Sequence, residues 1–297
     1  MPDFLILSHA ADETAGAVAA ALARRHGPGA VLLLSMEQLL LAGSWSHRLA
    51  DGRATSHLRL APGPTLASDG IGVVFNRLRQ VSVPHFRRAT DRDYAAMELF
   101  ALLLSWLASL PCAVVNPPSP RGLAGAERSP LEWLGLAARC GLPTRATRLT
   151  TNARAFARVG FERCGNLAGR SLPSPRGLRA GGGVPAAELL RREVAIPPGP
   201  RPALYREPVG PDRRRVLMVG DRVLGAPSPW WAEACRRLAA RSGCPLLEVV
   251  LVSTTRRPDD WAVQEAGAFP HLSGGEAVGA IVELLEARVA GSGARRS

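Results

Sequence analysis

Two polar residues directly follow a short apolar strand and could bind a ligand. Residues 73–75 are apolar and predict a strand, which Asn76 and Arg77 follow. Open parallel sheets bind ligands outside the carboxyl ends of their strands, and a guanidinium can pair with carboxylate or phosphate oxygens. The sequence therefore predicts Asn76 and Arg77 as substrate-binding residues. The alternative is that they are solvated strand ends.

Histidine and cysteine do not organise a catalytic or metal site. The histidines, at positions 9, 26, 47, 57, 85 and 271, show no ligand spacing, and there is no Gly-x-Ser-x-Gly motif of the kind that hydrolases carry. The five cysteines are odd in number and form no Cys-x-x-Cys pair. The sequence therefore predicts neither a zinc site nor a disulfide framework.

Arginine supplies all of the basic charge. The chain has 37 basic residues against 25 acidic ones, a formal net charge of +12, and no lysine. The arginines are scattered in twos and threes, and aromatic residues make up only 5% of the chain. A nucleic-acid-binding surface would gather them on one face. We interpret the composition as a coding bias of the source genome and expect no nucleic-acid partner.

The sequence has no segment that predicts export or membrane insertion. No uninterrupted apolar run approaches the roughly 18 residues needed to span a bilayer. The first residues lack the basic start and long apolar core of an export signal. We therefore expect a cytoplasmic protein without a membrane partner.

Alternating strands and helices predict an open parallel sheet in the first part of the chain. Asp51 and Gly52 are typical of the turn of a β-hairpin, here spanning residues 45–60. Together these segments predict an N-terminal α/β domain over residues 1–118. The predicted strands are 4–8, 30–35, 73–75 and 112–115, and the predicted helices are 15–25, 36–41 and 91–110.

The rest of the chain predicts an α+β arrangement after a weakly patterned middle. Ser129, Pro130 and Glu132 are typical of a helix start. A Gly- and Pro-rich loop at 163–185 indicates a reduced central region, residues 119–200, before a C-terminal domain, residues 201–297. The other predicted elements are strands 146–150, 216–219, 223–224, 246–252 and 261–265, and helices 152–159, 231–242 and 275–289.

Several of these segments resemble ATP-grasp proteins, especially the RimK-like peptide ligases. They are the strand end FNR, the helix YAAMELFALLLSWL, the segment VVNPP and the helix ending in CGLPTRAT. Near the end of the chain, WAVQEAGAFPHL resembles the closing motif Glu-x-Asn-x-x-Pro of that family. The resemblance implies an ATP-grasp-like domain after the parallel sheet, with ATP and Mg²⁺ as cofactors.

The resemblance implies a magnesium site with a reduced set of ligands. Glu265 matches the glutamate of the closing motif, and Gly267 replaces its asparagine. Val250 stands where the family has a metal-binding aspartate, and Glu248 lies two residues earlier, on the same face of the strand by alternation. We expect Glu265 and Glu248 to bind Mg²⁺ weakly. The alternative is that both are merely acids at strand ends.

The resemblance also implies residues that bind the nucleotide. The family uses lysines on the phosphates, and this chain has none, so arginine must replace them or the site is inactive. The implied phosphate-binding residues are Arg163 and Arg170. The implied residues at the adenine and ribose are Tyr205, Arg206 and Glu207. The implied catalytic residue is Arg215, which in the family faces the phosphate and the acceptor carboxylate.

Two functions are compatible with these residues. The missing lysines, Gly267 and the eroded middle favour a degenerate ATP-grasp-like protein that serves as a nucleotide- or peptide-binding accessory subunit. The alternative is an active ATP- and Mg²⁺-dependent carboxylate–amine ligase that works through an acyl phosphate. The expected partners are a peptide or a small carboxylate or amine substrate, a partner enzyme, and a second copy of the chain. An α/β protein unrelated to ATP-grasp is a third possibility.

Overall fold

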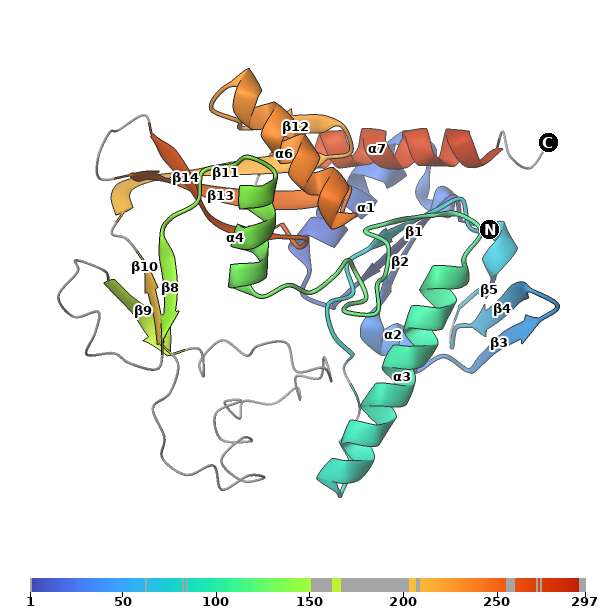
Figure 1. Ribbon diagram of the computed structural model, residues 1–297. Coiled ribbons are helices and arrows are strands. Elements are labelled where there is room, and N and C mark those ends of the chain that lie inside the picture. Colours follow the sequence, from blue (N-terminus) through green and yellow to red (C-terminus); the bar gives the residue numbers. More distant parts are fainter. Residues whose placement is uncertain are drawn as a thin grey trace.

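The computed structural model describes residues 2–61, 63–81, 83, 85–150, 162–166, 203–206, 209–254, 260–270, 272 and 274–293. Its two larger sheets are a parallel one near the N-terminus and an antiparallel one near the C-terminus, and each is accompanied by a three-stranded antiparallel sheet (Figure 1). This arrangement confirms the predicted α/β fold with an α+β second half.

The N-terminal sheet is open and entirely parallel, as predicted. Its strand order is β2-β1-β6-β7, built from β1 (Phe4–Ser8), β2 (Val31–Ser35), β6 (Val73–Asn76) and β7 (Ala113–Val115). The crossover helices α1 (Glu13–His26) and α3 (Ala89–Ser109) cover opposite faces, because alternate residues of β1 pack against different helices. The order therefore reverses between β1 and β6, where a doubly wound sheet presents its ligand-binding edge.

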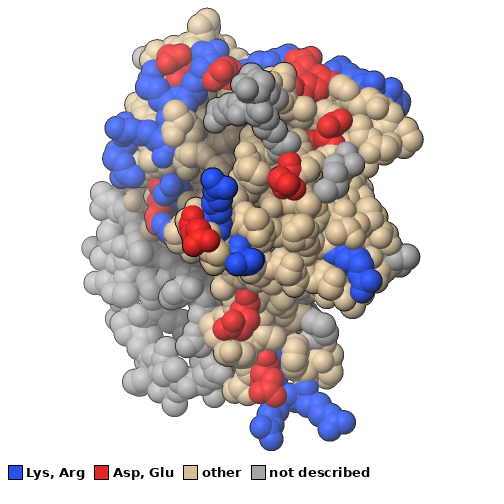
Figure 2. Space-filling model, turned by 90° about the vertical axis from the view of Figure 1, so that its right-hand side faces the viewer, with Lys and Arg blue, Asp and Glu red and all other residues tan. Residues whose placement is uncertain are grey.

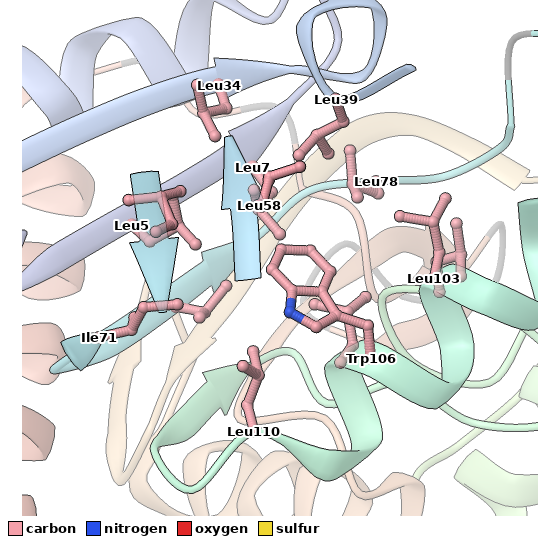
Figure 3. Close-up of a cluster of buried hydrophobic side chains, with 14 of the residues drawn as sticks. Leu5, Leu7, Leu34, Leu39, Leu58, Ile71, Leu78, Leu103, Trp106 and Leu110 are labelled. Carbon is pink, nitrogen blue, oxygen red and sulfur yellow. The ribbon is translucent and has the colours of Figure 1, made fainter. Parts of the chain in front are cut away.

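The predicted β-hairpin forms, and it packs on one side of α3. Asp51 and Gly52 have φ angles of 53° and 70°, which are those of a tight type I′-like hairpin turn. The hairpin packs on α3 through Trp45, whose ring lies edge-on to Trp106 at 5.1 Å, and adds to the cluster of buried side chains in Figure 3. The elements of this region are β3 (Ser44–Ala50), β4 (Arg53–Arg59), β5 (Thr65–Ala67), α2 (Met36–Leu40) and the short 3₁₀ turns Pro28–Ala30 and Ser68–Gly70.

The C-terminal sheet is antiparallel, with strand order β12-β11-β13-β14. The helices α4 and α6 pack on one of its faces, and α7 packs on part of the other face while also contacting α1. The elements are β11 (Val209–Val219), β12 (Arg222–Leu224), β13 (Leu246–Thr254), β14 (Trp261–Gly267), α4 (Pro130–Arg139), α6 (Pro229–Ser242) and α7 (Gly275–Gly293).

In sequence order, a three-stranded antiparallel sheet comes between the two larger sheets. Its order is β8-β10-β9, from β8 (Thr147–Thr150), β9 (Glu162–Asn166) and β10 (Ala203–Arg206). The sequence predicted a loop from Arg163 onward, so β9 corrects that prediction; its residues ERCGN include no β-branched side chain that would have indicated a strand. The helix predicted at 152–159 lies outside the described residues.

The surface carries its charges in small groups. Figure 2 shows, on the face that it presents, arginines interspersed with acidic residues rather than gathered into one basic surface. Among the described residues, no helix has the length and apolar character that crossing a membrane requires.

Candidate functional site

Three of the predicted site residues share one face of the C-terminal sheet. Arg215 of β11 pairs with Val250 of β13, which pairs in turn with Glu265 of β14, so these three side chains form one row across the sheet. Glu248 lies two residues before Val250 and opposite Gly267, on the same face. The structure thus brings Arg215, Glu248 and Glu265 together on what we call the acidic face.

The opposite face explains why these residues point outward. Along β11 and β13, buried apolar residues alternate with the residues of the acidic face, and α4 and α6 cover them. Burying those side chains fixes the register, since a shift by one residue would expose the whole apolar set. The buried residues are Val216, Met218, Leu247, Val249 and Leu251.

A β-bulge turns Glu265 toward the acidic face. Val263 pairs with Leu251 on the buried face, whereas Glu265 pairs with Val250 on the other face. One step along β13, from Val250 to Leu251, therefore corresponds to two steps along β14, from Glu265 to Val263. Gln264 is the extra, unpaired residue of the bulge. In a regular strand, Val263 and Glu265 would share a face and the carboxylate would point into the core. Bulges of this kind re-aim side chains, often next to active sites.

The acidic face combines opposite charges at close range. The guanidinium Nη1 of Arg215 lies 3.6 Å from Oε1 of Glu248, and the two side chains are 60% and 20% exposed. Arg213, which sequence reasoning did not select, is exposed on the same face two residues before Arg215. Exposed guanidiniums next to carboxylates suit a ligand that carries both phosphate and a divalent cation.

The donor set fits a magnesium ion bound together with phosphate. Mg²⁺ is usually bound by one or two carboxylates, with substrate phosphates and water completing its shell. Glu248 and Glu265 supply two carboxylates from neighbouring strands on one face. A side chain at Gly267 would have space, because a Cβ there meets no atom within 4 Å. Among the described residues, no group of three or more histidine, cysteine or acidic side chains could hold a metal.

The predicted nucleotide-binding residues are described only in part. Tyr205 and Arg163 are directly paired in the backbone of β10 and β9. The side chain of Arg206 is 7% exposed, and its Nε has no hydrogen-bond partner among the described residues. Arg170 and Glu207 lie outside the described residues. The roles of these five residues remain predictions.

Asn76 and Arg77 lie at the carboxyl edge of the parallel sheet, as predicted, and both are almost completely buried. The Nδ2 of Asn76 donates to the carbonyl oxygens of Asn116 and Leu123, at 3.1 and 2.6 Å. The Nε of Arg77 donates to Oδ2 of Asp12 at 2.6 Å. These contacts are with the protein's own chain, so the substrate-binding role remains a prediction.

One hollow among the described residues lies elsewhere. It measures about 420 Å³ and lies between α4 and residues 144–147, lined on the helix side by Leu131, Leu134, Gly135 and Ala138. Its lining does not include Arg215, Glu248 or Glu265. This hollow is therefore separate from the acidic face.

Comparison with known proteins identifies the fold. No family model matches the chain, and no curated protein sequence matches it. A RiPP-associated ATP-grasp ligase of Chryseobacterium gregarium, solved with ADP and a leader and core peptide, has a TM-score of 0.68 at 16% identity, covering 97% of this chain and 97% of that chain. The macrocyclase MdnB of Microcystis aeruginosa has a TM-score of 0.69 at 17% identity, covering 96% and 99%.

A third similar structure was solved with Mg and a nucleotide. The ATP-grasp ligase PsnB, complexed with a phosphomimetic variant of its minimal precursor, Mg and ADP, has a TM-score of 0.66 at 17% identity, covering 97% of this chain and 99% of that chain. The chain therefore has the fold of ATP-grasp ligases along nearly its whole length, and the predicted ATP-grasp-like fold is confirmed.

Proposed function

We propose that this protein is an ATP-dependent ligase that joins a carboxylate to an amine of a peptide substrate. The observation that carries the proposal is the bulge at Gln264, which places Glu265 on the same face as Glu248 and Arg215. Two carboxylates and a guanidinium on one face are the groups that a complex of Mg²⁺ with a phosphate-bearing ligand requires. The solved neighbours support a peptide substrate, since they are complexes with a leader and core peptide and with a variant of a minimal precursor.

The residues of the acidic face have distinct roles in this proposal. Glu248 and Glu265 would hold Mg²⁺, which supplies charge neutralisation on the phosphates of ATP. Arg215 would pair with the phosphoryl oxygens as they pass to the substrate carboxylate. Because transfer of a phosphoryl group is catalysed mainly by positioning and electrostatic stabilisation, two carboxylates and a guanidinium on a rigid sheet are suited to it. The amine would then displace phosphate from the activated carboxyl group.

Nucleotide binding in the presence and absence of Mg²⁺ tests the proposal. Calorimetric titration of wild type with ATP should show binding that strengthens with Mg²⁺, and Glu265→Ala should lose that magnesium dependence. Glu98→Ala, which removes an exposed glutamate of α3 on the other sheet, serves as the matched control and should behave as wild type. Magnesium-independent binding in all three proteins would overturn the assignment of Glu265.

A second function is favoured by Gly267 and by the absence of lysine. A protein that binds nucleotide or peptide without turnover would need fewer ligands on Mg²⁺ and no lysine on the phosphates. Such an accessory subunit would act together with a partner enzyme. Formation of ADP on addition of peptide distinguishes the two functions, because the accessory protein would bind Mg²⁺-ATP and leave it intact.

A further inference from the structure

A segment that follows β14 crosses the carboxyl edge of the parallel sheet. We call Ala268, Phe269, Pro270 and Leu272 the crossing segment. The Nδ2 of Asn116 donates to the carbonyl of Ala268 at 2.9 Å. The Nη1 of Arg77 donates to the carbonyl of Pro270 at 3.2 Å. Thr14 Oγ1 accepts a hydrogen bond from the amide of Leu272 at 3.3 Å.

These three contacts follow the order of the strands. Asn116 comes directly after β7, Arg77 comes directly after β6, and Thr14 lies at the start of α1, which follows β1. The three strands are neighbours in the order β7-β6-β1. Ala268, Pro270 and Leu272 are therefore hydrogen-bonded in turn to residues that follow β7, β6 and β1. The edge between β1 and β6 is where an open sheet of this topology binds its ligand. Here the protein's own backbone fills that position.

Besides donating to Pro270, the guanidinium of Arg77 contacts Asp12 and Phe269. Its guanidinium pairs with Asp12 at 2.6 Å, with both side chains at most 10% exposed, and it lies 4.6 Å from the ring centroid of Phe269. Arg79 lies 4.9 Å from the same ring. Asp12 also caps α1 by accepting from the amide of Ala15 at 3.0 Å. A buried charge pair is costly to break from one side, because the remaining charge is left without a partner.

The same edge anchors the strand that carries Glu248. The side chain of Asn116 donates to the carbonyl of Leu246 and accepts from its amide, both at 2.8 Å. Leu246 is the first residue of β13 and lies two residues before Glu248. The crossing segment begins directly after β14, which carries Glu265. Both strands of the acidic face are therefore fixed to the parallel sheet at the end nearest their carboxylates.

We infer that the carboxyl edge of the parallel sheet positions the two carboxylates of the acidic face, with Arg77 and Asn116 as positioning residues. The inference rests on the proposed function, because it takes Glu248 and Glu265 as ligands of Mg²⁺. The contacts of the buried Arg77 explain this positioning role. A ligand could bind the guanidinium only by displacing Pro270 and Asp12.

A double variant removes the anchor while keeping the helix cap. In Asp12→Asn/Arg77→Gln, the asparagine can still accept from the amide of Ala15, but the ion pair and the guanidinium are lost. The matched control is Arg121→Gln/Glu132→Gln, which also removes one arginine–carboxylate pair and also keeps a helix cap, on α4.

Two measurements read out positioning. Hydrogen exchange of residues 261–272 should become about tenfold faster in the double variant and unchanged in the control, since local opening governs exchange. The Mg²⁺ concentration that half-saturates ATP binding should rise by about fivefold or more, while ATP affinity in chelator stays within about twofold. Arg77→Lys, which keeps the charge beside Asp12, should restore part of both effects. A loss of stability alone would not change magnesium dependence in folded protein.

Each result decides the inference. Unchanged exchange in the double variant would overturn it, and so would faster exchange with unchanged magnesium dependence. If wild type binds no ATP, the proposed function fails, and the exchange of residues 261–272 alone decides whether Arg77 anchors β14. If the double variant does not fold, Thr14→Val, which removes only the acceptor of the Leu272 amide, is measured in the same way, with the same expected directions.

Discussion

Consecutive arginines on opposite faces of β11 give a matched pair of variants at the residue scale. Arg215 lies on the acidic face beside Glu248, whereas Arg214 lies on the other face, 5.2 Å from the ring of Trp261. Removing a group that stabilises charge in the transition state typically costs a factor of ~10²–10³ in rate. We predict that loss for Arg215→Met in peptide-dependent ADP formation, and a nearly unchanged rate for Arg214→Met. Equal losses in the two variants would contradict the role of the acidic face.

Gly267 offers a gain-of-affinity variant on the same face. It lies opposite Glu248, and a Cβ at this position meets open space. Gly267→Asn adds a carbonyl oxygen, a ligand type that Mg²⁺ accepts. We predict that the Mg²⁺ concentration for half-saturation of ATP binding falls by about three- to tenfold, up to ~1.4 kcal/mol. Gly279→Asn in α7, where a side chain also has open space, is the control and should change nothing.

The outward direction of Glu248 could be predicted from the sequence, and that of Glu265 could not. Alternation along β13 is regular, so Glu248 lies with Val250 away from the buried Val249 and Leu251. The face of Glu265 depends on the bulge, and a bulge arises from how two strands pair rather than from the residues of one strand. Glu265 itself was found only through the resemblance of its motif.

At the element scale, α4 depends on a capping box that also sets a pH response. Ser129 Oγ accepts from the amide of Glu132, and the carboxylate of Glu132 accepts from the amide of Ser129 and from Arg121. The side-chain hydrogen bond from Arg121, followed by that from the Ser129 backbone, lowers the pKa of Glu132 to about 2. A carboxyl group whose pKa is lower in the folded protein stabilises the native state at any pH above the pKa that it has in the unfolded chain. This stabilisation is lost as the pH falls toward the pKa of the folded state.

We predict that Glu132→Gln is less stable than wild type at neutral pH and that the difference disappears in acid. The difference in the free energy of unfolding should be constant at pH 6–7, decrease below about pH 4.5 and vanish near pH 2. Its size should be below about 1 kcal/mol, because the Arg121 and Glu132 side chains are 45% and 40% exposed. Urea unfolding of both proteins across this range measures it. A difference that grows toward acid pH would contradict the prediction.

Elements with local signals could be predicted from the sequence, and elements made by pairing could not. The cap at Ser129 and the turn at Asp51 and Gly52 depend on residues close in sequence, and both are confirmed. β11 begins at Val209, well before the predicted start at residue 216, because its polar residues pair with β13 and the amide of Asp212 donates to Ser253. Such strands follow from long-range partners.

At the scale of the whole molecule, the first and last parts of the chain share one hydrophobic cluster. Phe4 and Ile6 of β1 pack in the same cluster as Ile281 and Leu285 of α7. At the surface above it, Arg25 Nη1 lies 3.0 Å from a carboxylate oxygen of Glu286. The anchoring of β13 and β14 at the carboxyl edge of the parallel sheet adds a second connection. We therefore expect the two large sheets to unfold together rather than as separate domains.

Ile281→Ala tests this cooperativity. The side chain is fully buried in the shared cluster, so truncation should cost ~2–5 kcal/mol. Because the cluster belongs to both sheets, tryptophan fluorescence and far-ultraviolet circular dichroism should still report a single urea transition, shifted to lower urea with an unchanged slope. Leu58→Ala, in a cluster that the N-terminal part alone forms, should give the same single transition if folding is cooperative. Two separated transitions in either variant would show that the sheets fold independently and that the carboxyl edge does not couple them.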